Sequence, residues 1–180
     1  MRVLIAVASK HGGTLEIATR VGGLLTARGH PARVQDAATV QGLGDVDAVV
    51  LSSAIYFTRW LPAAVQLSKR LEDGLRDRPV WLFSSGLSGD PAKTAPKPNA
   101  QLSSLLKRTG ARSHRLFGGR LDRSRLNLWE RLLVKLARSW GDETRDWLQV
   151  ERWANDVADE LDAVASADTR KSSAGPGHVT

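Results

Sequence analysis

Cysteine is missing from this chain of 180 residues, and its absence excludes several classes of chemistry. Without a thiol there is no disulfide bond, no thiolate nucleophile, no zinc ribbon and no cysteine-ligated iron–sulfur cluster. The four histidines stand far apart and show no i, i+4 pairing with carboxylates. The sequence therefore predicts no metal site, and no catalytic residue can be assigned from it.

Long apolar runs are missing too. No stretch approaches the ~18 apolar residues of a membrane span, and the first residues enter a strand pattern without the features of a signal peptide. We therefore expect a cytoplasmic protein. With 42% apolar residues, the chain is expected to form one domain over residues 1–165. Residues 166–180 are rich in small and polar residues without an apolar period, which predicts a flexible tail.

Common nucleotide-binding and hydrolase motifs are also absent. Neither the P-loop pattern G-x-x-x-x-G-K-[ST] nor the dinucleotide pattern G-x-G-x-x-G occurs. The segment 86–90, GLSGD, lacks the last glycine of G-x-S-x-G, and no histidine follows at a suitable position for a catalytic partner. Because redox chemistry on a bound cofactor needs no protein nucleophile, these absences favour a cofactor-dependent protein.

The clearest positive signal lies at the start of the chain. Six apolar residues, Val3 to Ala8, run without a break, which is typical of a strand buried on both faces of a parallel sheet. The polar stretch Ser9 to Thr14 follows, and a helical pattern begins directly after it. A strand that turns through Gly12 and Gly13 into a helix directs backbone N–H groups and the positive end of the helix dipole to one point. We therefore predict a phosphate-binding loop here.

Strand and helix patterns alternate along the rest of the chain. This alternation predicts an α/β fold, with a doubly wound five-stranded parallel sheet and helices on both faces. We expect further strands near 31–34, 48–51, 79–83 and 114–117, and helices near 60–71 and 100–109. In such a sheet a ligand lies outside the carboxyl ends of the strands. Three polar loops fall there and could hold one elongated ligand: 9–14, 52–57 and 84–89.

The chain resembles the flavodoxin-domain family that includes the bacterial menaquinone-dependent protoporphyrinogen oxidases, in the order of four segments: SKHGGT, SSAIYFTRWLPAA, FSSGLSGDPAK and RLFGGRLDRSRLNLWERLLVKLARSWGDETRDW. The resemblance covers Met1 to about Ala165 and implies a flavodoxin-like fold with FMN as cofactor. The positions that match the phosphate loop are Ser9, Lys10, His11, Gly12, Gly13 and Thr14. The positions that match the two flavin-flanking loops are Ala54, Ile55, Tyr56 and Phe57 in the first, and Ser85, Gly86, Leu87 and Ser88 in the second.

The resemblance also implies a reaction. A reduced small molecule, a protoporphyrinogen, would pass electrons through FMN to a quinone. The alternative is an electron-transfer flavodoxin that hands electrons to a redox protein and oxidises no substrate of its own. Tyr56 and Phe57 stand where the family more often carries basic or polar residues, on the side from which a substrate would approach. Nearby, Trp60 offers a surface that could stack on the flavin or pack under the following helix.

Positive charge is concentrated late in the chain. Between Gln101 and Arg145, eleven basic residues stand against four acidic ones, so this segment carries the whole net charge of +7. Within it, Arg123 to Trp140 forms an amphipathic basic helical pattern. Such a helix could lie against the inner face of the cell membrane, or it could cover a face of the sheet or dock a redox partner. Binding of nucleic acid or lipid by a flavin-free fold is a third alternative, and our preferred interpretation involves no nucleic acid.

Overall fold

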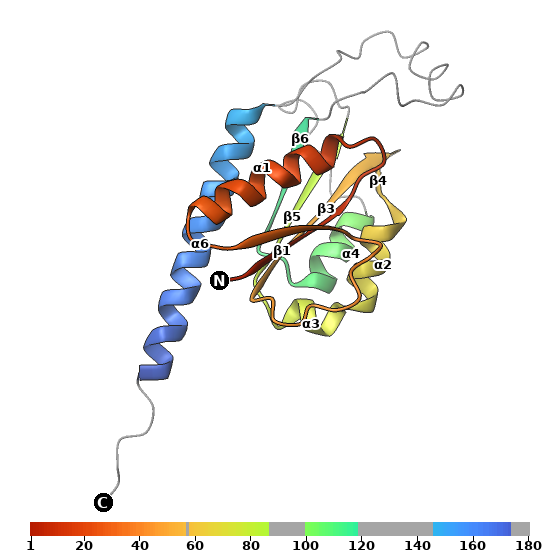
Figure 1. Ribbon diagram of the computed structural model, residues 1–180. Coiled ribbons are helices and arrows are strands. Elements are labelled where there is room, and N and C mark those ends of the chain that lie inside the picture. The colour runs from red at the N-terminus through yellow and green to blue at the C-terminus, as the bar shows by residue number, and fades with distance from the viewer. Residues whose placement is uncertain (57, 87–99, 119–145, 174–180) are drawn as a thin grey trace, which may run out of the picture.

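The computed structural model describes residues 1–56, 58–86, 100–118 and 146–173 (Figure 1). The predicted basic helix Arg123–Trp140 and residues 174–180 lie outside these ranges. The strands are β1 (Val3–Ala8), β2 (Ala32–Asp36), β3 (Ala48–Tyr56), β4 (Arg59–Trp60), β5 (Val80–Gly86) and β6 (Ser113–Gly118). The helices are α1 (Gly13–Ala27), α2 (Pro62–Arg70), α3 (Glu72–Arg76), α4 (Ala100–Thr109) and α6 (Trp147–Ser173).

Within the described residues, five parallel strands form the sheet in the order β2-β1-β3-β5-β6, and β4 pairs antiparallel with β3. The chain runs outward from β1 to β2 and then crosses back to β3, so the strand order reverses between β1 and β3. Ligands bind at this point in doubly wound sheets. The topology confirms the predicted doubly wound parallel sheet with helices on both faces.

Both faces of β1 are buried, which explains its unbroken apolar run. Successive side chains of a strand point to opposite faces. The residues on the side of Ile5 join a core with α1 and α6, and those on the side of Leu4 join a second core with α2, α3 and α4. Figure 1 shows the same two layers of helices, one on each side of the sheet. The sheet is thus covered on both faces, while its edge at the carboxyl ends carries the loops.

Helix α6 packs on the sheet through an aromatic cluster. Trp153 of α6 meets Phe83 of β5 and Phe117 of β6, with ring centroids 5.6 Å apart in both pairs, and the two phenylalanines lie 5.5 Å from each other. All three pairs are edge to face, the arrangement that the ring quadrupoles favour. Residues far apart in the sequence therefore form one continuous core beneath α6.

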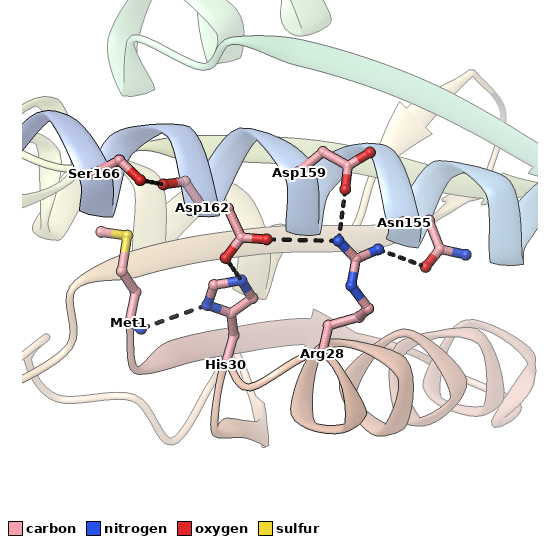
Figure 2. A network of polar contacts seen from close by, with 7 residues as sticks. All are labelled: Met1, Arg28, His30, Asn155, Asp159, Asp162 and Ser166. Atoms are coloured by element: carbon pink, nitrogen blue, oxygen red, sulfur yellow. Dashed lines mark hydrogen bonds and ion pairs between the residues drawn. The ribbon is translucent and has the colours of Figure 1, made fainter.

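A polar network also ties the end of α1 to α6 (Figure 2). Arg28, the residue after α1, donates a hydrogen bond of 2.6 Å to Asp159. The buried ring of His30 lies between the amino group of Met1, 3.4 Å from Nδ1, and the carboxylate of Asp162, 3.2 Å from Nε2. The Arg28–Asp159 ion pair is exposed, and a pair of this kind contributes little to the stability of the fold.

Some element boundaries differ from the sequence predictions. The helix expected from Trp60 begins at Pro62, because Trp60 belongs to β4 and pairs with Ile55 of β3. Neither β4 nor the short helix α3 was predicted. The strand expected to end at Phe83 continues to Gly86. Its last residues are two serines and a glycine, which suggest a loop in the sequence; in the sheet both serines pair with β3 and β6, and Gly86 pairs with β6.

The prediction of a flexible tail from Ser166 is wrong as far as Ser173, because α6 continues to that residue. Ser166, Thr169 and Arg170 each bond through the side chain to a backbone carbonyl one turn earlier. The missing apolar period in this segment therefore indicates that this part of α6 does not pack on the core. An exposed helix needs no apolar period. None of the described helices is long and apolar enough to cross a membrane.

Replacing Trp153 with alanine should lower the free energy of unfolding by about 3–5 kcal/mol, because it empties the centre of the aromatic cluster. Urea denaturation measures this change. As a control on the same helix, Leu148→Ala alters a side chain that is 54% exposed and should change the value by less than about 0.5 kcal/mol. Equal effects of the two substitutions would contradict the packing described for α6.

Candidate functional site

The turn between β1 and α1 is closed by an internal hydrogen bond, and no side chain in the described part of the chain caps the helix that follows it. Gly12 has φ 87°, a left-handed conformation that glycine adopts without strain. Its N–H donates to Oγ of Ser9 over 3.2 Å. Helix α1 begins at Gly13, and among the described residues no side chain caps its first turn. Backbone N–H groups and the positive end of the helix dipole therefore face the loop, as the sequence predicted.

The turn between β1 and α1, Ser9 to Thr14, is called the phosphate turn below after its predicted role. A buried hydrogen bond joins it to the end of β5. Thr14 is 2% exposed, and its Oγ1 lies 2.7 Å from Oγ of Ser85. Ser85 in turn pairs with Ala54 at the end of β3. The structure thus brings together residues from all three loops that the sequence assigned to one ligand site.

The first flavin-flanking loop is a hairpin, defined here as the 55–60 hairpin. Ile55 pairs with Trp60, and Tyr56 pairs with Arg59. Thr58, at the tip, has φ 65°, which is rare for a β-branched residue and marks a strained turn. Phe57, the remaining predicted residue of this loop, lies outside the described residues.

Tyr56 links the hairpin to the phosphate turn. Its ring centroid lies 6.2 Å from that of His11, with the planes inclined by 60°, and Nζ of Lys10 lies 5.6 Å from the same ring. A cation over an aromatic ring at an exposed site contributes about 0.5–1 kcal/mol. These contacts place an aromatic surface and a positive charge beside the turn that would hold an anion.

The second flavin-flanking loop is described only at its start. Ser85 is buried, and Gly86, the last residue of β5, pairs with Gly118 of β6. Gly86 is partly exposed and has no side chain, which permits a ligand to approach its backbone closely. Leu87 and Ser88 lie outside the described residues, so their predicted role stays a prediction.

Sequence reasoning missed a buried polar chain on the other face of β5. The indole Nε1 of Trp60 donates to Oγ of Ser84 over 2.7 Å, and that oxygen lies 2.7 Å from Nε2 of His114. Trp60 is only 5% exposed and joins the core beneath α2 and α4. Of the two roles open for Trp60, the structure therefore shows packing. No signal in the sequence pointed to this chain, because its three members come from different strands.

The protonation state of His114 follows from its burial. Burial lowers the pKa of His114 from 6.5 to about 4, so the ring is neutral at pH 7. An indole N–H can only donate, so the Ser84 oxygen accepts from Trp60. In the tautomer of the neutral ring that carries its proton on Nδ1, the Ser84 hydroxyl donates its own proton to Nε2 of His114.

In the part of the chain that the structure describes, no three His, Cys, Asp or Glu side chains cluster so that they could hold a metal ion. The ends of three strands come together at this edge: the turn after β1, the 55–60 hairpin after β3 and the end of β5, with the strand order reversing between β1 and β3. The fold and this arrangement define a doubly wound α/β protein whose switch point carries a turn suited to an anionic ligand.

The chain belongs to the flavodoxin domain family, whose pattern matches residues 4–146. The predicted family and fold are thereby confirmed, and FMN, the expected cofactor, is the cofactor of this flavin-binding family. The match supports a flavodoxin-like electron-transfer domain. It contains nothing specific to protoporphyrinogen oxidases. Among curated proteins, no significant match to the chain is found.

Solved structures share the fold. Rubredoxin:oxygen oxidoreductase from the anaerobe Desulfovibrio gigas superposes with a TM-score of 0.61 and 13% identity, over 90% of this chain but only 36% of that one. A mutant flavodoxin from Pseudomonas aeruginosa gives 0.59 and 19% identity, and a flavodoxin from the domain Archaea gives 0.55 and 13%. In both flavodoxins the match covers 90% of this chain and 99% of the other. This chain therefore corresponds to about a third of the oxidoreductase and to the whole length of the flavodoxins.

Acidification should destabilise the protein through His114. As the pH falls through 6.5 the unfolded chain binds a proton on this ring, whereas the folded protein binds it only near pH 4. The stability that depends on neutral His114 is therefore complete above pH 6.5 and is lost as the pH falls to about 4, on the order of 3 kcal/mol in total.

Urea denaturation of the wild type and of His114→Gln at pH 7, 5.5 and 4.5 measures this effect. The variant lacks the titrating ring, so its free energy of unfolding should fall less steeply with pH than that of the wild type. Parallel pH profiles for the two proteins would contradict the buried, neutral state of His114.

Proposed function

We propose that the protein binds FMN at the switch point between β1 and β3 and passes electrons through it. The observation that carries the proposal is the uncapped start of α1 behind the left-handed turn at Gly12, joined through Thr14 and Ser85 to the ends of two further strands. Family membership supplies the identity of the anionic ligand. When bound, FMN supplies the electron-transfer chemistry that the chain's own side chains lack.

The residues of the phosphate turn are suited to hold a phosphate. Backbone N–H groups at the start of α1 would donate to its oxygens, and the positive end of the helix adds a favourable field. Ser9 accepts a hydrogen bond from Gly12 and keeps its own hydroxyl proton for a phosphate oxygen. Lys10 would contribute positive charge at the mouth of the turn.

The residues at the other two strand ends would hold the flavin ring. Tyr56 offers an aromatic face next to the phosphate turn, and Ala54 and Ile55 lead the chain towards it. At the end of β5, Gly86 leaves its backbone open for contact with the edge of the ring. An aromatic pair of this kind contributes about 0.5–1.5 kcal/mol beyond the area that it buries.

Gly12→Asp should abolish FMN binding, with the dissociation constant raised at least about 100-fold. The substitution sets a carboxylate beside the phosphate and puts a side chain where φ is 87°. Titration of the purified protein with FMN, followed by quenching of flavin fluorescence, measures the constant.

The matched control is Gly23→Asp, the same substitution further along α1, where an added Cβ meets nothing within 4 Å. It should bind FMN like the wild type. A wild-type protein that neither co-purifies with flavin nor binds added FMN would refute the proposed function.

Beyond electron transfer, we propose oxidation of a protoporphyrinogen-type substrate with a quinone as acceptor. Its support is the resemblance of the segments around the phosphate turn, the two strand ends and residues 115–147, together with the basic pattern Arg123–Trp140, which would bring the protein to an anionic membrane surface that holds quinone. The rival is a carrier that docks on a redox protein through the same positive charge.

An anaerobic reaction distinguishes the enzyme from the carrier. Protoporphyrinogen should bleach the flavin absorbance, and a menaquinone analogue in anionic vesicles should restore it at low salt. Arg131→Glu with Lys135→Glu should slow only the second step. If protoporphyrinogen leaves the flavin oxidised while a chemical reductant bleaches it, the protein is a carrier.

A further inference from the structure

The 55–60 hairpin is held from three sides. The N–H of Leu61, just beyond it, donates to Oγ of Ser53 over 2.9 Å. The backbone N–H of Trp60 donates to Oε1 of Gln101 on α4 over 2.8 Å. The indole of Trp60 donates to Oγ of Ser84 on β5. Of these three bonds, the one between Trp60 and Ser84 is formed by two side chains, whereas the other two use a backbone N–H of the hairpin or of Leu61.

That third bond depends on His114. The Ser84 hydroxyl can turn about its own bond, and the direction of its proton decides where its lone pairs point. When the Ser84 hydroxyl donates its proton to Nε2 of His114, 2.7 Å away, its lone pairs are left for the indole N–H of Trp60. The rings of Trp60 and His114 also lie near each other, with centroids 6.4 Å apart. Removing the His114 acceptor would therefore weaken the hydrogen bond between Ser84 and Trp60, which holds the hairpin.

The anchor matters because the hairpin is strained at its tip. Thr58 has φ 65°, a conformation that is strained for a β-branched residue and persists only where the surroundings enforce it. Tyr56 pairs with Arg59, next to the anchored Trp60, so movement of one strand of the hairpin is passed to the other. The position of the Tyr56 ring beside the phosphate turn thus depends on how firmly Trp60 is held.

We propose that His114 is a positioning residue that acts through Ser84 and Trp60 to hold the 55–60 hairpin where Tyr56 can flank the flavin ring. The flavin part of this inference rests on the proposed function, whereas the docking of the hairpin does not. Ser84 and Ser85 then have parallel roles on opposite faces of β5: Ser85 binds the start of α1 through Thr14, and Ser84 binds the hairpin.

The test compares His114→Leu, which removes the acceptor, with His114→Gln, whose amide oxygen can still accept from Ser84. Hydrogen exchange of the backbone amides at 55–61 is measured without flavin, and FMN affinity is measured by fluorescence titration. In His114→Leu, exchange at the hairpin should accelerate about fivefold and the dissociation constant should rise about fivefold, the effect of one lost hydrogen bond. In His114→Gln both should stay within about twofold of the wild type.

Three further substitutions complete the test. Ser84→Ala breaks the chain in the middle and should reproduce the effects of His114→Leu, which also serves if the leucine variant folds poorly. Ser68→Ala removes another buried hydroxyl, one that donates within α2 to the carbonyl of Val65, and should leave both readouts unchanged. In a Trp60→Phe background, which lacks the indole donor, His114→Leu should have no additional effect on either readout.

Uniform acceleration of exchange over the whole sheet, with unchanged FMN affinity, would overturn the proposal and leave His114 a general core residue. Equal effects of leucine and glutamine at position 114 would also overturn it. If the wild type binds no FMN, the proposed function fails and takes the flavin part of the inference with it. The exchange at 55–61 then decides by itself whether His114 holds the hairpin.

Discussion

Two neighbouring serines at the end of β5 connect the parts of the site. Ser85 is hydrogen-bonded to Thr14 in the first turn of α1, and Ser84, on the other face of the strand, binds the indole of Trp60. Because side chains alternate across a strand, one short segment can hold both the phosphate turn and the hairpin that faces it. Both serines are buried, so each hydroxyl needs a partner, and an unpaired one would cost about 1–3 kcal/mol.

The site combines a rigid part with a strained part. The phosphate turn follows a fully buried strand and leads into a helix that packs on the sheet, so its backbone N–H groups are fixed before any ligand arrives. The hairpin opposite contains Thr58 in a left-handed conformation and depends on contacts with β5 and α4. A preformed anion site beside an adjustable aromatic surface suits a ligand with a phosphate at one end and a planar ring at the other.

Predictions from the sequence succeeded where a local pattern has one physical meaning. The apolar run Val3–Ala8 is typical of a strand buried on both faces, and the structure shows that strand, with the glycine turn after it leading into a helix. The prediction of a helix over 100–109 matches α4 at both ends. The prediction failed at Trp60, where an apolar residue before Pro62 fits a helix start and a short strand equally well, and at Ser166, where a lack of packing was taken for a lack of helix.

The sequence by itself determined the fold class, the strand, glycine turn and helix at the start of the chain, and the order in which the three loops follow the strands, because these depend on local periodicity and on the backbone freedom of glycine. Only the tertiary structure decided that Thr14 binds Ser85, that Trp60 is packed rather than exposed, and that His114 is neutral. Each of these depends on a contact between residues 24 to 71 positions apart. Such contacts arise when separate strands and helices pack together in the fold, and a local sequence pattern does not specify that packing.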